Sequence, residues 1–160
     1  MLGVLALRIG MALANALDPF VSHPIRLKWP NDLFVGDGKL AGVLIEARWR
    51  ESLVDWVAIG VGVNMRAPSE FSPAASVRDD VSRSELLQAT IPPIREAARR
   101  TGALNEPELD EWRLRDLSAG RRITSPTHGV VQGISTDGAL MVESDGVVSA
   151  VRAGSLVFSS

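Results

Sequence analysis

Cysteine is absent from this sequence of 160 residues, and histidine occurs only twice. The lack of cysteine excludes disulfide bonds, thiolate metal sites and catalysis by a cysteine nucleophile. His23 and His128 have no metal-binding residue at ligand spacing beside them, so we predict no protein-built metal site. The 17 basic and 19 acidic residues give a net charge of −2, which argues against a strongly positive surface for nucleic acid.

A hydrophobic run long enough to span a bilayer is also missing. Residues 1–17 are apolar and contain Ala14-x-Ala16, a pattern typical of a signal-peptide cleavage site. Arg8 interrupts this run, no basic segment precedes it, and it is too short for a bilayer. We therefore expect an ordinary helix packed on a sheet, no membrane segment and, by default, a cytoplasmic protein.

The apolar content of 46% is enough for one domain with a small appendage. Apolar residues at helical spacing predict a helix over residues 2–16. Alternation predicts a strand over residues 25–29, and β-rich runs at 40–47 and 53–63 predict an antiparallel hairpin. The second run is apolar on both faces, so we expect a central strand that is covered above and below.

Two further helices and a long loop follow the predicted hairpin. Residues 67–82 are rich in Pro, Ser and Ala, as is typical of a functional or disordered loop. Ser82 begins a capping box, and Pro92-Pro93 is expected to kink or break the helix that follows, because each proline removes a backbone donor. Pro107 predicts the first turn of another helix.

The sequence changes character near residue 118, where five short β-like stretches begin. Glycine turns separate these stretches, and two of the turns are the Asp-Gly pairs of tight hairpins. The whole pattern predicts an α+β fold. We expect a mixed or antiparallel sheet with flanking helices over residues 1–117, and a small SH3-like β-barrel over residues 118–160.

A rigid turn after the strand at 25–29 carries the first candidate site. Lys28 lies on the polar face of that strand, and Pro30 presents the amide of Asn31 and the carboxylate of Asp32. Lys39 begins the next strand and brings a second ammonium to the same rim. Two cations, a carboxylate and an amide suit a ligand that carries phosphate, although the same polar residues could simply cap turns.

The second candidate site is a patch without side chains. Gly60, Gly62 and Asn64 share one face of a strand, because they are two residues apart. Such a patch accommodates either a flat ligand or a packed helix or ring, and it is not a GxGxxG nucleotide loop. Strict alternation places Gly42 and Lys39 on opposite faces, so a shared ligand would meet Gly42 through its backbone.

Two motifs make the sequence similar to a known family. KWPNDLFVGDGKLAGVLIE (28–46) and WVAIGVGVNM (56–65) resemble the central region of biotin protein ligases, and residues 121–158 resemble the small C-terminal domain of that family. These enzymes attach biotin to a lysine of biotin-dependent carboxylases. The resemblance implies ATP and biotin as substrates, Mg²⁺, and a carboxylase biotin-carrier domain as partner. It implies no nucleic-acid or membrane partner and leaves a homodimer open.

The resemblance also implies the residues that bind biotin. Lys39, in the GKLAG motif, matches a lysine that touches both the biotin side and the phosphate of the acyl-adenylate. Gly42, Gly60 and Gly62 match the glycines along which biotin lies.

A second group of matches lies on the nucleotide side. Lys28 and Asn31 match the motif that lines the active site for ATP and the adenylate, together with Lys39. Asn64 matches an asparagine near the nucleotide. Asp32 matches the motif carboxylate that orients the incoming lysine amine, so we expect Lys39 and Asp32 to be catalytic.

The sequence departs from the family at its start. Family members carry an Arg/Gly-rich loop upstream of the first helix, and no such run occurs here. We therefore expect an N-terminally truncated ligase domain with little or no activity, with the loop at 67–82 as a lid. The alternative is a non-catalytic biotin-binding or acceptor-binding module of the same fold.

Overall fold

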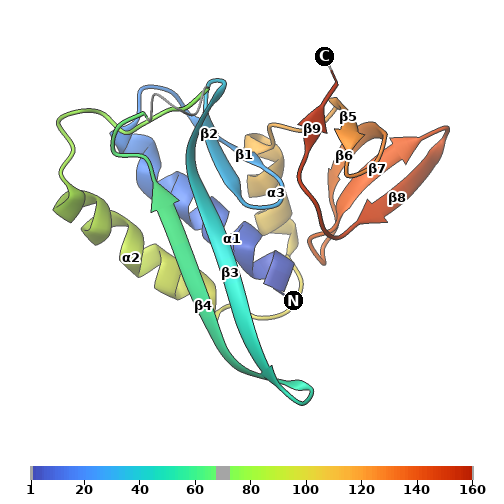
Figure 1. Cartoon of the computed structure of the whole chain (residues 1–160), viewed down its shortest axis with the longest axis horizontal. Helices are drawn as coiled ribbons and strands as arrows, with labels where there is room; N and C mark the ends of the chain where they lie inside the picture. The colour runs from blue at the N-terminus through green and yellow to red at the C-terminus, as the bar shows by residue number, and fades with distance from the viewer. Residues whose placement is uncertain (1, 68–72, 160) are drawn as a thin grey trace.

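The first helix forms the centre of the molecule. The computed structural model describes residues 2–67 and 73–159, and α1 (Leu2–Leu17) is followed by the 3-10 turn η1 (Asp18–Phe20). Ten residues of α1 are buried, because it packs against the first sheet and both other helices (Figure 1). Residues Leu2–Phe20 are long and apolar enough to cross a membrane, so the prediction that this run is too short is wrong. Half of that window is nevertheless buried in the fold. This burial is the pattern of a core helix.

The predicted hairpin belongs to a four-stranded antiparallel sheet with the strand order β1-β2-β3-β4. Its strands are β1 (Ile25–Lys28), β2 (Asp32–Val35), β3 (Gly38–Arg50) and β4 (Leu53–Val63). The hairpin prediction is confirmed, but the prediction of a central position for β4 is wrong. Within residues 2–67 and 73–159, β4 pairs with β3 alone and is an edge strand. Apolar residues on both faces do not make this strand central, because much of its surface stays exposed.

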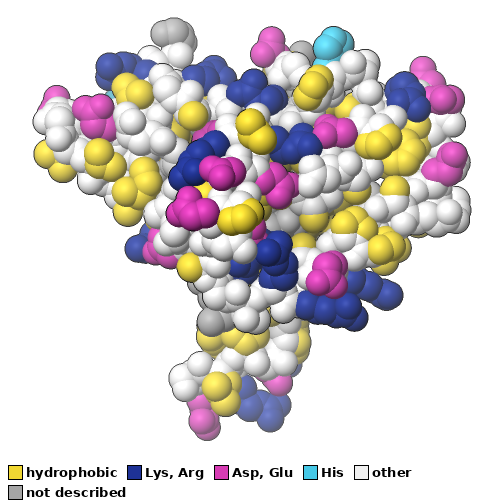
Figure 2. Space-filling view, turned by 180° about the vertical axis from the view of Figure 1, so that it is seen from behind, with side chains coloured by type: hydrophobic (Ala, Val, Ile, Leu, Met, Phe, Trp, Pro, Cys, Tyr) yellow, Lys and Arg dark blue, Asp and Glu magenta, His cyan; other side chains and the backbone are white. Residues whose placement is uncertain are grey.

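The β3–β4 hairpin continues beyond the rest of the sheet as a narrow arm (Figure 1). The residues between the two predicted runs are mostly part of β3, since only Glu51 and Ser52 form the turn. Glu51 adopts a φ of 56°, the left-handed conformation that such a tight turn requires. Trp49 and Trp56 on the arm are about half exposed, at 53% and 48%. The body above the arm shows basic and acidic side chains interspersed (Figure 2).

The second helix, α2 (Arg83–Arg99), passes through both internal prolines without a break. The capping box at Ser82 is confirmed. Of the predicted kink or break at Pro92-Pro93, the break is wrong, and the kink stays a prediction. Each proline removes only its own donor, and α2 lies along α1, so packing outweighs the missing bonds. The third helix, α3 (Glu106–Arg115), has Pro107 in its first turn, as predicted.

The remaining strands form a second antiparallel sheet with the order β8-β7-β6-β5-β9. They are β5 (Arg122–Ser125), β6 (Gly129–Ile134), β7 (Leu140–Ser144), β8 (Val147–Val151) and β9 (Val157–Phe158). The β7–β8 hairpin turns on Asp145 and Gly146, both with positive φ, as the Asp-Gly signal predicts. No pairing joins β8 to β9 among the described strands, so a closed SH3-like barrel is not confirmed.

The two sheets are tied together by one hydrophobic core. The indole of Trp29 donates a buried hydrogen bond of 3.1 Å to the carbonyl of Gly138. The backbone N–H of Leu117 donates to the carbonyl of Leu27, and the core includes Ile123 of β5 beside the apolar face of α1. The division between residues 117 and 118 therefore stays a prediction. The α+β fold with antiparallel sheets and flanking helices is present as expected.

Candidate functional site

An irregularity in the sheet decides where Lys39 points. Leu33 pairs with Ala41 but Phe34 pairs with Lys39, so β3 has one extra residue, Leu40, at this point. Leu40 and Ala41 are both buried, which shows that the alternation of faces shifts there. The prediction that strict alternation separates Lys39 from Gly42 is therefore wrong.

The shift brings Lys39, Gly42 and Asp32 together. A Cβ atom on Gly42 would lie 3.5 Å from Lys39 Nζ and 3.2 Å from Asp32 Oδ1. Lys39 Nζ and Asp32 Oδ1 form an ion pair of 2.5 Å, with the lysine side chain 48% exposed and the aspartate 23%. A side chain at position 42 would require the Asp32 carboxylate to shift by a few tenths of an ångström, so Gly42 leaves room for this pair.

Lys28 faces the same pair from the neighbouring strand. Lys28 is directly opposite Asp32 in the β1–β2 register, so the two side chains lie on the same face of the sheet. Burial lowers the pKa of Lys28, and the positive charges of Lys39 and Arg121 lower it further, while Asp32 opposes them. The chain has only two lysines, and both lie here.

The two asparagines predicted for the site are engaged in the fold. Asn31 Nδ2 donates to the carbonyl of Val43 at 2.6 Å, and the Asn31 carbonyl accepts from the Val43 N–H at 2.9 Å. Asn64 Nδ2 donates to the carbonyls of Lys39 and Ala75, at 3.0 and 3.1 Å. Both amides hold the strand that carries Lys39.

The glycine patch borders an open cleft of about 520 Å³. The cleft is lined by Lys39, Leu40, Ala41, Gly42, Gly62, Val63, Asn64, Pro73 and Ala74. No described atom outside its chain neighbours lies within 4 Å of a Cβ placed on Gly62, and the corresponding Cβ on Gly60 would touch only Leu44. Among the described residues, no packed helix or ring covers this part of β4, so the patch is accessible to a flat ligand.

The described part of the predicted lid loop is bonded to the site. The N–H of Lys39 donates to the carbonyl of Pro73 at 3.2 Å, and the N–H of Ala75 donates to the carbonyl of Lys39 at 2.9 Å. A Cβ atom on Gly38 would lie 2.7 Å from the carbonyl carbon of Ala74, so this contact requires glycine. The sequence analysis did not assign that role to Gly38, and residues 68–72 of the loop lie outside the described part of the chain.

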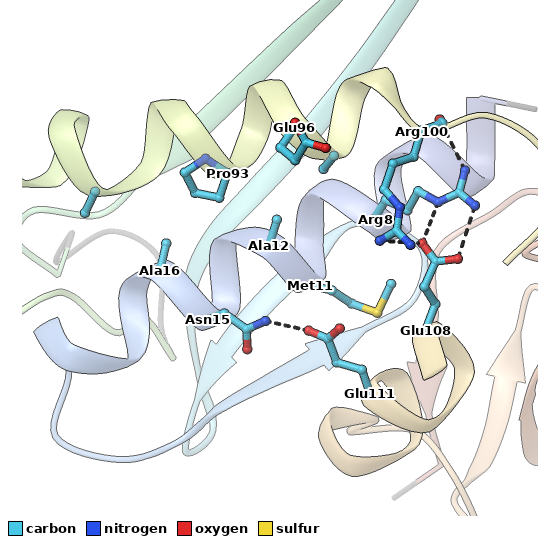
Figure 3. A pocket seen from close by; sticks show the side chains of 12 residues that line it. Arg8, Met11, Ala12, Asn15, Ala16, Pro93, Glu96, Arg100, Glu108 and Glu111 are labelled. Atoms are coloured by element: carbon cyan, nitrogen blue, oxygen red, sulfur yellow. Dashed lines mark hydrogen bonds and ion pairs between the residues drawn. The ribbon is translucent and has the colours of Figure 1, made fainter. Parts of the chain in front are cut away.

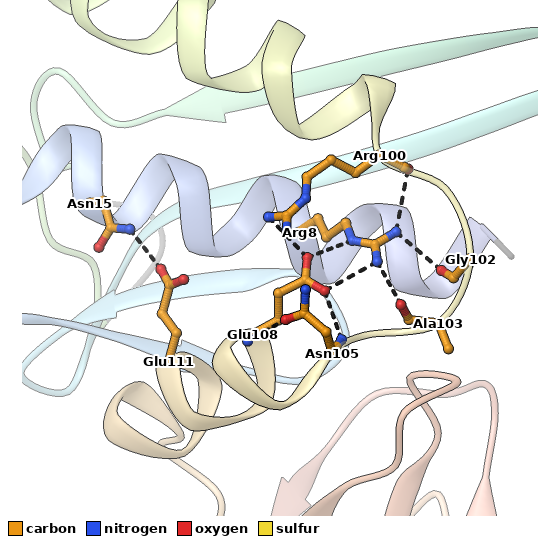
Figure 4. Close-up of polar contacts among 8 residues, drawn as sticks. All are labelled: Arg8, Asn15, Arg100, Gly102, Ala103, Asn105, Glu108 and Glu111. Carbon is orange, nitrogen blue, oxygen red and sulfur yellow. Dashed lines mark hydrogen bonds and ion pairs between the residues drawn. The ribbon is translucent and has the colours of Figure 1, made fainter.

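A second cavity, of about 470 Å³, lies between α1, α2 and α3 (Figure 3). Its charged groups are used within the fold: Arg8 donates to Glu108 at 2.7 Å and to the carbonyls of Arg100, Gly102 and Ala103 (Figure 4). Arg8 and Glu108 are almost fully buried, and the hydrogen bond from Arg8 lowers the pKa of Glu108. We interpret this network as a structural tie between three helices.

The second sheet adds residues that the sequence analysis missed. Phe158 in β9 places its ring centroid 5.2 Å from Lys28 Nζ, and Arg121 Cζ lies 3.5 Å from the same centroid. No spacing signal links these three residues in the sequence, because they come from distant segments that only the fold brings together.

The sequence of this chain is similar to those of known ligases. The sequence model of the Biotin/lipoate A/B protein ligase family matches residues 2–64. The bifunctional ligase/repressor BirA of Salmonella typhimurium is 30% identical over 98% of this chain and 53% of the relative. The biotin--[acetyl-CoA-carboxylase] ligase of Paracoccus denitrificans is 30% identical over 87% of this chain and 64% of the relative.

A solved structure has the same fold. The biotin protein ligase from Aquifex aeolicus in complex with biotin and ATP superposes with a TM-score of 0.78, at 22% identity, over 99% of this chain and 72% of that chain. The chain spans little more than half the length of the BirA relative. The solved structure shows the fold, and the family model and the curated relatives show that the chain belongs to the biotin/lipoate A/B protein ligase family.

Proposed function

We propose that this chain is the catalytic part of a biotin protein ligase, which activates biotin with ATP and transfers it to a lysine of a carboxylase biotin-carrier domain. The observation that carries the proposal is the Lys39–Asp32 ion pair beside Gly42, at the end of a cleft bordered by glycines. The names of its relatives support the same activity.

In the first step the biotin carboxylate attacks the α-phosphorus of ATP, forms biotinyl-5′-AMP and releases pyrophosphate. We assign biotin to the side-chain-free surface of Gly42, Gly60 and Gly62, where a fused ring can lie flat. The ammonium of Lys39 reaches the carboxylate and the α-phosphate, and it stabilises the charge that develops on the phosphoryl oxygens. Lys39 is therefore the residue whose charge the first step needs most.

The nucleotide side is assigned to Lys28, Asn31, Lys39 and Asn64. Lys28 adds a second positive charge, and the asparagines contribute by holding β3 through their amide hydrogen bonds. Among the described residues, no cluster of three or more possible metal ligands occurs, and the carboxylate of Asp32 is paired with Lys39. Mg²⁺ would therefore enter on the phosphates of ATP, where it supplies further charge neutralisation.

In the second step the acceptor lysine amine attacks the acyl carbonyl, and AMP leaves. We assign Asp32 to this step, because its carboxylate can accept a hydrogen bond from the incoming amine and orient it. Lys39 stays beside the departing phosphate. A cytoplasmic location, an SH3-like form of the C-terminal segment and a homodimer remain predictions. The first is a default expectation, and the second is drawn from the turn pattern as well as from the family resemblance.

Trapping of the activated intermediate tests the proposal. With the 160-residue chain in excess over biotin, MgATP and hydroxylamine should yield biotinyl-hydroxamate, even where turnover is slow. Lys39→Ala should reduce the yield about 100-fold or more, since one charged donor to the transition state is lost. Arg48→Ala is the matched control, because Arg48 is an exposed cation on the same strand but outside the cleft.

Two results would contradict the assignment. Biotin binding by calorimetry without any hydroxamate would identify a binding module in place of a ligase. An equal yield from the Lys39→Ala variant and the wild type would remove Lys39 from its role.

A further inference from the structure

The positive charge beside the cleft continues from the first sheet onto the second. Lys28 Nζ lies 5.6 Å from the ring centroid of Phe34 and 5.2 Å from that of Phe158. Arg121 Cζ lies 3.5 Å from the Phe158 centroid, which is the distance of a guanidinium stacked on an aromatic face. Phe158 therefore lies against both Lys28 of the first sheet and Arg121, which directly precedes β5 of the second sheet.

Within residues 2–67 and 73–159, both cations lack a polar partner of their own. Among the residues that the structure describes, neither the Arg121 guanidinium nor the Lys28 ammonium forms a hydrogen bond or an ion pair. The carboxylate of Asp32 lies opposite Lys28 in the sheet, and it is already paired with Lys39. Lys28, Lys39 and Arg121 therefore place three positive charges beside the single negative charge of Asp32, in a chain whose net charge is −2.

Arg121 is held in place by its own backbone. Its N–H donates to the carbonyl of Ser118 and its carbonyl accepts from the N–H of Val131, both at 3.0 Å. The guanidinium lies against the ring of Phe158, and Arg121 is an exposed residue, so its N–H groups are accessible to a ligand. A planar fork of donors on a fixed base is the arrangement that binds two oxygens of a phosphate group.

We propose that Arg121 and Lys28 form a subsite for the β- and γ-phosphates of ATP and for the pyrophosphate that leaves; this inference rests on the proposed function. When the biotin carboxylate bonds to the α-phosphorus, the bond from that phosphorus to the bridging oxygen breaks. The pyrophosphate takes the electron pair, and its new charge needs neutralisation away from Lys39. Repulsion from Lys39 and Arg121, which helps lower the pKa of Lys28, would be relieved by an anion bound between them.

Calorimetric titration with magnesium pyrophosphate tests this subsite in the full chain. Arg121→Ala should weaken pyrophosphate binding about tenfold or more, because it removes a bidentate charged contact. Arg122→Ala is the matched control: it removes the same charge from the next residue, which is the first of β5, and should change the affinity less than about twofold. Phe158→Leu should produce an intermediate loss, since the apolar bulk stays but the stacking face is lost.

The outcomes separate this inference from the proposed function. Equal losses in the Arg121 and Arg122 variants, or no loss in Arg121→Ala, would overturn the subsite. Biotin titrated alone provides the second arm, and Arg121→Ala should leave its affinity unchanged. The wild type could bind pyrophosphate but no biotin, while Arg121→Ala loses the pyrophosphate binding. In that case the proposed function is wrong and the phosphate subsite stands.

Discussion

At the cleft, the missing side chains of three glycines matter as much as the charged groups of Lys39 and Asp32. Gly42 leaves room for the Lys39–Asp32 pair, Gly38 allows the chain at Ala74 to approach, and Gly62 leaves the cleft open. Glycine destabilises a strand interior by roughly 0.5–1 kcal/mol relative to alanine. These glycines therefore lower the stability of the strands but keep the cleft accessible to a ligand. Substitutions can separate the effect on stability from the effect on ligand binding.

Gly62→Val should weaken biotin binding about tenfold or more without unfolding the protein. A Cβ atom at Gly62 meets nothing among the described residues, so the valine would extend into the cleft where we place biotin. The free energy of unfolding should stay equal or rise by up to about 1 kcal/mol, because valine suits a strand better. Calorimetry and urea unfolding measure the two quantities.

Ala58→Val is the control for this change. Ala58 lies on the same face of β4 as Gly62, is exposed, and does not line the cleft. Biotin affinity should not change in this variant. Unaltered biotin binding by Gly62→Val would show that biotin does not occupy the glycine surface.

Glu108 should make the stability of the protein fall in acid. Its pKa is held below the ordinary value of 4.5, mainly by the hydrogen bond from Arg8. The unfolded chain therefore takes up this proton at a higher pH than the folded chain does. The stabilisation is complete above about pH 4.5 and is lost as the pH falls through the lowered pKa of the folded state.

Glu108→Gln isolates that contribution. At pH 7 it should reduce the free energy of unfolding by about 3 kcal/mol, because Arg8 stays buried with a weakened partner. The difference from the wild type should shrink as the solution is acidified. Glu106→Gln, on the exposed side of the same helix, should cost less than about 1 kcal/mol in urea unfolding. A constant difference at every pH would contradict the assignment.

At the scale of elements, neighbouring elements override local propensity in α2. The helix continues through Pro92 and Pro93 because it begins with a complete capping box and packs along α1. In the same way, the extra residue at Leu40 in β3 is set by pairing with β2 and by packing. An element can thus keep a locally unfavourable residue when its neighbours supply enough contact.

Pro92→Ala should stabilise the protein by about 1–3 kcal/mol. The substitution restores one helical hydrogen bond and removes the clash of the ring with the carbonyl of Gln88. Pro92 is exposed, so no packing is lost. Urea unfolding measures the change, and Gln88→Ala in the same helix should alter stability by less than about 0.5 kcal/mol. A loss of stability in Pro92→Ala would indicate that the proline shapes the contact with α1.

At the scale of the whole molecule, the second sheet completes the core of the first part. Trp29 donates to Gly138, Leu104 donates to Thr136, and a Cβ atom on Gly138 would lie 3.1 Å from Leu7. Such contacts are typical of one cooperative unit. They also explain how the second sheet can contribute Arg121 to a site on the first sheet.

Both parts of the chain should unfold in urea with one midpoint. All four tryptophans precede residue 118, so their fluorescence reports the first part alone. Amide resonances of residues 118–159 report the second sheet. Coincident transitions are expected because the core is shared. A second sheet that unfolds at a clearly lower urea concentration would contradict this and favour two independent domains.

Some features could be predicted from the sequence because they depend only on residues that are neighbours in the chain. The capping box at Ser82, the Asp-Gly turn at Gly146 and the β3–β4 hairpin follow from the nearest residues, and the structure has all three. The KWPND and GKLAG motifs identified Lys28, Asp32 and Lys39, and the fold brings these charged groups together.

Other features depend on contacts between elements that are distant in the chain. The position of Lys39 beside Gly42 needs the register shift at Leu40, the edge position of β4 depends on which strands pair with it, and α2 passes Pro92 because α1 supports it. The approach of Arg121 to Lys28 joins segments that are far apart in the chain. Register, packing and long-range approach arise from contacts between elements, and no pattern of neighbouring residues contains them.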